Sequence, residues 1–129
     1  MKRSDINPWE WSKAFGFSQA VLVAESAQVL YCSGQTAIGP DGALPSTGDM
    51  AEQVTAALAN LRTALEGAGM GFADIVRLHF STTDVDARLA AYGAVGEVLG
   101  TNLPAMTVIG ANRLAFSELM AEIEATAAR

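Results

Sequence analysis

The sequence predicts one α+β domain that spans residues 1–129, and two observations support this fold class. First, apolar runs of strand length alternate with two segments of helical period, in the order β β α β α β β. Second, a chain of 129 residues with 50% hydrophobic residues and no internal repeat suits a single core of ordinary size. We therefore expect a mixed sheet with both helices packed on one face.

The first half of the chain contains two strand-like runs and one helical segment. The runs 17–24 and 29–32 are separated by a short polar segment, which predicts an opening antiparallel hairpin. After Ser33, Gly34 and Gln35, turn residues dominate the chain as far as Gly48 and predict a loop of about a dozen residues. The segment 49–68 predicts a helix with Asp49 as its N-cap, and its apolar positions are Met50, Val54, Leu58, Leu61 and Leu65.

The second half of the chain predicts three strands and a second helix. The segment 75–83 is rich in β-branched and apolar residues, which favours a strand. Helix-compatible residues follow over 84–99 and end at a glycine, Gly100. Two further apolar runs, 105–111 and 119–127, predict the last two strands.

The last predicted strand carries two carboxylates on one face. Because side chains alternate along a strand, Glu122 and Glu124 project to one side and Ile123 to the other. We expect this strand to end the sheet. Its two carboxylates are then either solvated on an outward face or part of a functional site.

Composition excludes several classes of partner. Eight basic residues against fourteen acidic ones give a net charge of −6, and the basic residues form no cluster, which argues against nucleic-acid binding. A single cysteine, Cys32, and a single histidine, His79, supply neither a disulfide nor a familiar zinc site. No signal peptide and no membrane-spanning run is readable, so we expect a soluble cytoplasmic protein.

Only 17% of the residues are charged, so an unusual amount of apolar surface needs covering. Either the core is large for the size of the chain, or subunits bury this surface between them. The N-terminal segment, Met1 to Lys13, carries Trp9 and Trp11, which could pack on the domain.

Four further residues could take part in binding or catalysis but do not by themselves identify a reaction. Ser33 and Gly34 leave an apolar strand, where a backbone can approach a ligand closely, but a plain strand exit explains them equally well. His79 lies in the middle of a strand and suits a hydrogen-bonded core or interface residue. We interpret Cys32 as a small buried hydrophobic residue, because no cationic neighbour in the sequence activates its thiol.

A series of short motifs runs from about residue 14 to the C-terminus: Gly16 to Val21, Ser33-Gly34-Gln35, Asp41-Gly42, Asn60-Leu61, Thr83-Asp84, Pro104-Ala105 and Glu122 to Ala125. In this order, the motifs resemble those of the Rid family, also called YjgF-like or reactive intermediate deaminases. The resemblance implies a chorismate-mutase-like fold and a homotrimer with clefts between subunits. It also implies hydrolysis of an enamine or imine to a 2-keto acid and ammonia, without a cofactor or a metal.

The family's site residues are only partly retained. By resemblance, Glu122 positions the attacking water, and Ser33 and Gly34 belong to the same cleft. Met106 stands where the family has an arginine that binds the substrate carboxylate. Phe17 replaces a tyrosine of many members, and Val108 a cysteine of some. These changes predict a flexible apolar pocket with one acid, suited to a larger or less anionic ligand.

Two functions from different classes follow from this comparison. The first is a Rid-like hydrolase in which Glu122 handles the water. The second is a trimeric binding protein, without turnover, for a small apolar metabolite or for an enzyme that it regulates. RNA cleavage, ascribed to some relatives, is disfavoured by the net charge of −6.

Overall fold

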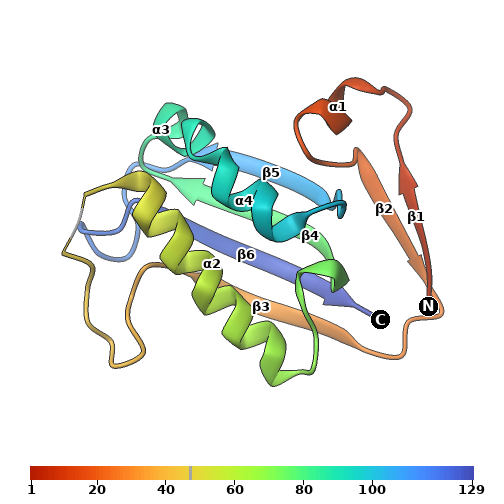
Figure 1. Cartoon of the computed structure of the whole chain (residues 1–129), viewed down its shortest axis with the longest axis horizontal. Coiled ribbons are helices and arrows are strands. Elements are labelled where there is room, and N and C mark those ends of the chain that lie inside the picture. Colours follow the sequence, from red (N-terminus) through yellow and green to blue (C-terminus); the bar gives the residue numbers. More distant parts are fainter. Residues whose placement is uncertain (47) are drawn as a thin grey trace.

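The computed structural model describes residues 1–46 and 48–129 and confirms the predicted α+β class (Figure 1). Six strands and four helices are present in the described part of the chain. The strands are β1 (Lys2–Ile6), β2 (Ala20–Ala24), β3 (Val29–Gln35), β4 (Ile75–Thr82), β5 (Ala105–Gly110) and β6 (Ala121–Ala128). The helices are α1 (Trp11–Ala14), α2 (Met50–Gly67), α3 (Val85–Ala90) and α4 (Tyr92–Leu99), with a 3₁₀ turn at Phe72–Asp74.

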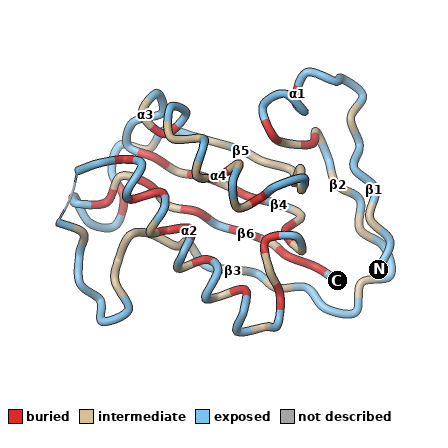
Figure 2. Tube along the Cα trace, viewed as in Figure 1, coloured by how far each residue is buried: buried red, intermediate tan, exposed pale blue. Residues whose placement is uncertain are grey.

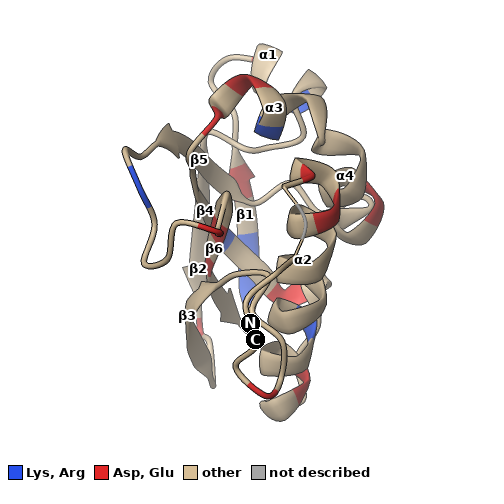
Figure 3. Cartoon of the chain, turned by 90° about the vertical axis from the view of Figure 1, so that its left-hand side faces the viewer, with Lys and Arg blue, Asp and Glu red and all other residues tan. Residues whose placement is uncertain are grey.

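The main sheet is mixed and is covered by helices on one face. Its strand order is β3-β6-β4-β5, in which β4 and β5 run parallel and the other neighbours antiparallel. Helices α2 and α4 lie on the same side of this sheet, as the turned view shows (Figure 3). The buried residues lie between these helices and the sheet (Figure 2). The opposite face of the sheet carries no helix, and we call it the open face.

Helix α2 forms where the sequence predicts it, because its start is capped and its apolar side chains share one face. The Asp49 carboxylate accepts a hydrogen bond from the backbone N–H of Glu52 at 2.9 Å. All five predicted apolar positions are buried against the sheet and α4. The helix ends before Gly69, whose φ of 69° places it in the left-handed region that glycine tolerates.

Strand β6 lies inside the sheet, so the expectation that it ends the sheet is wrong. It pairs with β3 through Cys32 and Ala125, and with β4 through Phe80 and Ile123. The predicted alternation is confirmed: Ile123 is buried, whereas Glu124 is exposed. An interior strand tolerates carboxylates here because only one face of the sheet is covered by helices.

The predicted opening hairpin is also wrong. Strand β2 pairs with the N-terminal strand β1, from Lys2 opposite Ala24 to Ile6 opposite Ala20. The chain turns away from β2 at Glu25, whose φ is 57°, and the carbonyl of Arg129 then accepts hydrogen bonds from the next backbone N–H groups. This contact with the C-terminus directs β3 into the main sheet instead.

The second predicted helix, over 84–99, is interrupted at one residue. Ala91 has φ −88° and ψ 14°, and its N–H bonds back to the carbonyls of Ala87 and Arg88. Gly93 and Gly96 lower the helix propensity of this stretch, so packing decides its path. The result is two short helices, α3 and α4, in place of one.

No helix in residues 1–46 and 48–129 is both long and apolar enough to cross a membrane. The open face nevertheless exposes large apolar side chains, among them Tyr31 at 79% exposure, Val29 at 49% and Ile109 at 45%. These side chains lie on β3 and β5, at the two edges of the sheet.

Candidate functional site

Glu122 and Gly34 meet across neighbouring strands on the open face. The pairing of β3 with β6 shifts register between Cys32 and Gln35, so Gly34 lies in an irregular, bulged stretch. A β-carbon on Gly34 would overlap the carboxylate of Glu122, which therefore occupies the space that the glycine leaves free. Ser33 precedes this glycine and is exposed. The structure thus brings together the predicted catalytic residue Glu122 and the predicted substrate-binding residue Gly34.

A shallow cavity of about 200 Å³ lies on the open face, and Glu124 is the acid that lines it. His79 and Glu124 are register partners on β4 and β6 and both line it. Cys32 and Tyr31 contribute from β3, and Arg77 from β4. His79 is half-buried, so the predicted alternative of a core or interface histidine stays a prediction.

Burial raises the pKa of the Cys32 thiol above its ordinary value. Alkylation of Cys32 at mildly alkaline pH should therefore be slower, by roughly threefold or more, than in the urea-unfolded chain. Because the folded pKa is the higher one, the stabilising contribution of this thiol is lost as pH rises through that value. Mass spectrometry of iodoacetamide labelling checks this expectation, and equal rates in both states would contradict it.

Phe17, Met106 and Val108 line a second, larger cavity of about 580 Å³. Met106 and Val108 come from β5, and Phe17 precedes β2. Trp11 packs edge-on against Phe17 with ring centroids 5.7 Å apart and also lines the cavity. The predicted apolar pocket is therefore present, and helix α1 supplies part of its wall.

The two halves of the predicted site lie on opposite faces of the sheet. Val108 is the register partner of Phe80, which is also the partner of Ile123, so these side chains share the helix-covered face. Glu122 neighbours Ile123 and points to the open face. Within one chain, the acid therefore does not reach the cavity of Met106, and the expected pocket that contains both, in a cleft between subunits, stays a prediction.

Sequence reasoning missed Arg88, which lines the same cavity from helix α3. This arginine is 1% exposed, and its guanidinium carbon lies 3.8 Å from the centroid of the Phe80 ring. Burial lowers the pKa of Arg88 to about 10. Its sequence neighbours Ala87 and Leu89 are apolar, which is a weak sign of burial. A helix of only six residues does not show from its sequence which of its faces is buried. The pocket is therefore not purely apolar, contrary to expectation.

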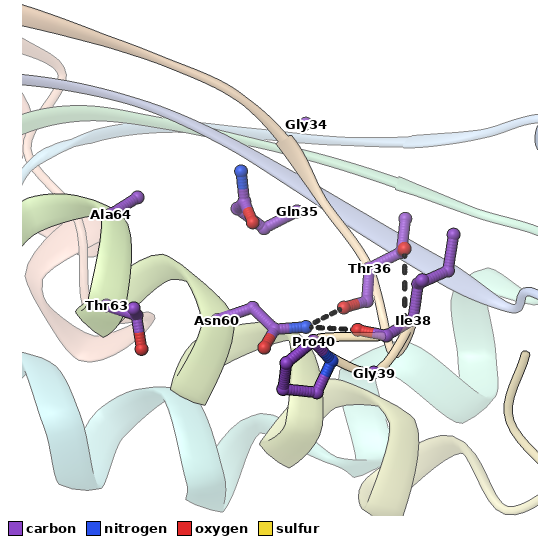
Figure 4. A pocket seen from close by; sticks show the side chains of 9 residues that line it. All are labelled: Gly34, Gln35, Thr36, Ile38, Gly39, Pro40, Asn60, Thr63 and Ala64. Carbon is purple, nitrogen blue, oxygen red and sulfur yellow. Dashed lines mark hydrogen bonds between the residues drawn. The ribbon is translucent and has the colours of Figure 1, made fainter. Parts of the chain in front are cut away.

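A third cavity, of about 470 Å³, lies between the end of β3 and helix α2 (Figure 4). Its polar centre is the side-chain amide of Asn60, which donates to the carbonyls of Thr36 and Ile38, both at 2.8 Å. Gly34 and Gln35 form one wall. The donor capacity of Asn60 is thus used to hold the loop after β3 against the helix.

No group of three His, Cys, Asp or Glu side chains in the described ranges, 1–46 and 48–129, is placed to hold a metal ion. The chemistry available on the open face is that of Glu122, with the backbone of Gly34 beside it. A carboxylate can orient a water molecule and accept its proton.

Comparison with known proteins gives a consistent result over nearly the whole chain. A family model described as Endoribonuclease L-PSP matches residues 11–129. The crystal structure of YyfB from Yersinia pestis, a protein of unknown function of the conserved Rid protein family, is similar with a TM-score of 0.87. That chain is 35% identical, and the match covers 100% of both chains.

Two relatives of known name are also similar in sequence. The mitochondrial protein mmf2 of Schizosaccharomyces pombe is 29% identical over 124 residues, which are 96% of this chain and 94% of that protein. The 2-iminobutanoate/2-iminopropanoate deaminase of Rattus norvegicus is 37% identical over 93 residues. This second match covers 69% of the chain and 63% of the rat protein.

Proposed function

The chain belongs to the Rid family, whose family model is described as endoribonuclease L-PSP, and we propose that it is a small-molecule hydrolase of the deaminase type. The observation that carries the proposal is the Glu122 carboxylate, held beside Gly34 in the space that this glycine leaves open. The similarity to the rat deaminase supports the same class of reaction. The proposed substrate is an enamine or imine.

The proposed reaction needs only a positioned acid and water. Glu122 orients a water molecule, whose oxygen bonds to the electrophilic carbon of the C=N group while its proton passes to the carboxylate. The nitrogen takes up protons, the C–N bond breaks, and ammonia leaves a C=O group behind. One imine and one water thus give one carbonyl compound and one ammonia.

The proposed active unit is a homotrimer whose clefts lie between subunits. Within one chain the acid and the large cavity lie on opposite faces of the sheet, so a cleft that contains both needs the open face of a second copy. The exposed Tyr31, Val29 and Ile109 supply apolar surface for such a contact. Light scattering should give about 40 kDa for three chains of 13.4 kDa. A mass of one chain at assay concentration would contradict this assembly.

The reaction is tested by following carbonyl product and ammonia from a panel of imines. Imines made in place from amino acids by an amino-acid oxidase, aromatic imines and enamine products of ring cleavage form the panel. The purified chain should accelerate hydrolysis of at least one member above the spontaneous rate. Spontaneous rates throughout the panel would overturn the proposal.

Alanine in place of Gly34 should separate the position of the acid from folding. The atoms nearest to the added β-carbon all belong to the flexible Glu122 side chain, from Cγ to the carboxylate, which can turn away, so the chain should fold with a melting temperature close to the original. Turnover should fall by roughly tenfold to a hundredfold because the carboxylate leaves its position. Alanine at Gly48, where no neighbouring atom lies within 4 Å, is the control. Unchanged turnover of the Gly34→Ala variant would contradict this role.

The second candidate is a binding protein without turnover, and the large cavity beside Met106 favours it. Its lining is mostly apolar, and none of its lining residues is an acid. Native mass spectrometry with a metabolite mixture would detect a retained ligand, and an unchanged ligand after long incubation would support binding alone. Turnover of that ligand would exclude this candidate. We propose no nucleic-acid or membrane partner, and in Figure 3 the basic residues are scattered over several elements. A cytoplasmic location stays a prediction.

A further inference from the structure

Arg88 is a buried cation without a partner in the described part of the chain. It is 1% exposed, and none of its three guanidinium nitrogens has a hydrogen-bond partner there. The ion pairs found in the described residues join Lys2 to Glu25, Arg3 to Asp5 and Lys13 to Glu10, and none includes Arg88. The Phe80 ring covers one face of the guanidinium.

Such an arrangement is costly unless an anion completes it. Buried arginines are normally paired, because transfer of a charge out of water is unfavourable without compensating hydrogen bonds. Burial lowers the pKa of this side chain only to about 10, so the guanidinium is charged at neutral pH. The Phe80 ring attracts the face of the guanidinium that stacks on it. The N–H groups lie in the plane of the guanidinium, so the ring accepts no hydrogen bond from them.

Arg88 is one of the residues that line the cavity of about 580 Å³. Of the residues that line it, Arg88 alone is charged, and most of the others are apolar. Trp11, Phe15 and Leu89 line the same cavity and are each more than half exposed, so the cavity opens to solvent at these side chains. Tyr92 adds a hydroxyl to the wall. The volume suits a small organic molecule.

We propose that Arg88 is the anion-binding residue of this cavity and that the ligand is a carboxylate with an apolar body. A guanidinium binds a carboxylate through two parallel N–H···O bonds, and the chain leaves these donors unused. Phe17, Met106 and Val108 then contact the apolar part of the ligand. The inference names the substrate class of the proposed deaminase and rests on that function for the reaction, but not for binding.

This assignment changes the expectation drawn from Met106. The sequence suggests that methionine at this position removes the cation that would hold a carboxylate. In the structure, Met106 and Arg88 line one cavity from different elements, β5 and α3. The positive charge is therefore present in the pocket, supplied from a helix instead of a strand.

Direct binding measurements on the full chain test the proposal without requiring turnover. Calorimetry near neutral pH compares 4-methyl-2-oxopentanoate with its methyl ester, which keeps the apolar body and loses the charge. The acid should bind roughly tenfold to a hundredfold more tightly than the ester. Arg88→Met should abolish this preference, and Arg88→Lys should retain part of it. Arg62→Met is the matched control, because Arg62 also stacks on a phenylalanine ring, Phe72, but is exposed.

Two outcomes would overturn the proposal. One is equal affinity of the unaltered chain for acid and ester; the other is an Arg88→Met variant that still prefers the acid. A melting temperature of Arg88→Met well below the original, together with equal binding of acid and ester, would show that Arg88 has a structural role instead. If the acid preference is present and depends on Arg88 but no imine is hydrolysed, the anion site stands and the deaminase proposal fails. If an imine is hydrolysed but acid and ester bind equally, the deaminase proposal stands and the anion-site proposal fails.

Discussion

Glutamine in place of Glu122 should reduce kcat for imine hydrolysis by roughly 10²- to 10⁴-fold, the usual contribution of a positioned acid or base. The amide has nearly the same shape as the carboxylate and fits beside Gly34, but it cannot accept the proton of the attacking water. KM should change little if the residue acts on water and not on the substrate. Steady-state kinetics on a substrate identified in the panel measures both constants.

Glu124 provides a matched control for this variant. It lies two residues further along β6, projects to the same open face, and is exposed opposite His79. Glu124→Gln removes the same charge from the same face and should leave kcat within about twofold, because the change is on the surface and away from the bulge. Equal losses in both variants would mean that the general charge of the face matters, and the specific role of Glu122 would be withdrawn.

Alanine in place of Phe80 should lower the free energy of unfolding by about 3–5 kcal/mol. The ring is fully buried in the core between the sheet and the helices, and it also supports the guanidinium of Arg88. A domain of ordinary stability has only about 5–15 kcal/mol in total, so the variant should be close to unfolding at raised temperature. Urea titration at a fixed protein concentration gives the change, since an oligomer's stability depends on concentration.

Phe116→Ala is the control for this second variant, because Phe116 is 47% exposed. Its loss should stay within about 0.5 kcal/mol. A loss below about 1 kcal/mol for Phe80→Ala would mean that the core collapses onto the space, or that Arg88 leaves the interior once its ring is gone. The double variant with Arg88→Met separates these two explanations, because the effects should then be strongly non-additive.

Elements with a strong local pattern were predictable from sequence. Helix α2 has a cap and a regular apolar face, and β6 has strict alternation, so neighbouring residues alone determine both. The partners of a strand are not a local property: β2 meets β1, whose residues include Lys2, Arg3 and Asp5, and no apolar alternation marks that strand. Which strands pair therefore depends on contacts between distant segments, and the short spacing between 17–24 and 29–32 does not determine it.

The candidate site also combines residues that the sequence predicts with features that only the structure shows. Sequence motifs identified Glu122 and Gly34, and the structure places them in contact across the bulge of β3. The burial of Arg88 follows from where α3 packs relative to β5, which no residue pattern near position 88 encodes. The separation of Met106 from Glu122 follows from the register of three neighbouring strands.

The central place of β6 also has a consequence for folding of the chain. This strand pairs with both β3 and β4, and the C-terminal residue Arg129 exchanges backbone hydrogen bonds with Gln28. Without residues 121–128, β3 and β4 have no neighbour between them and expose their pairing edges. The main sheet therefore closes only when β6 enters it, and a chain cut before Ala121 should be sensitive to proteases.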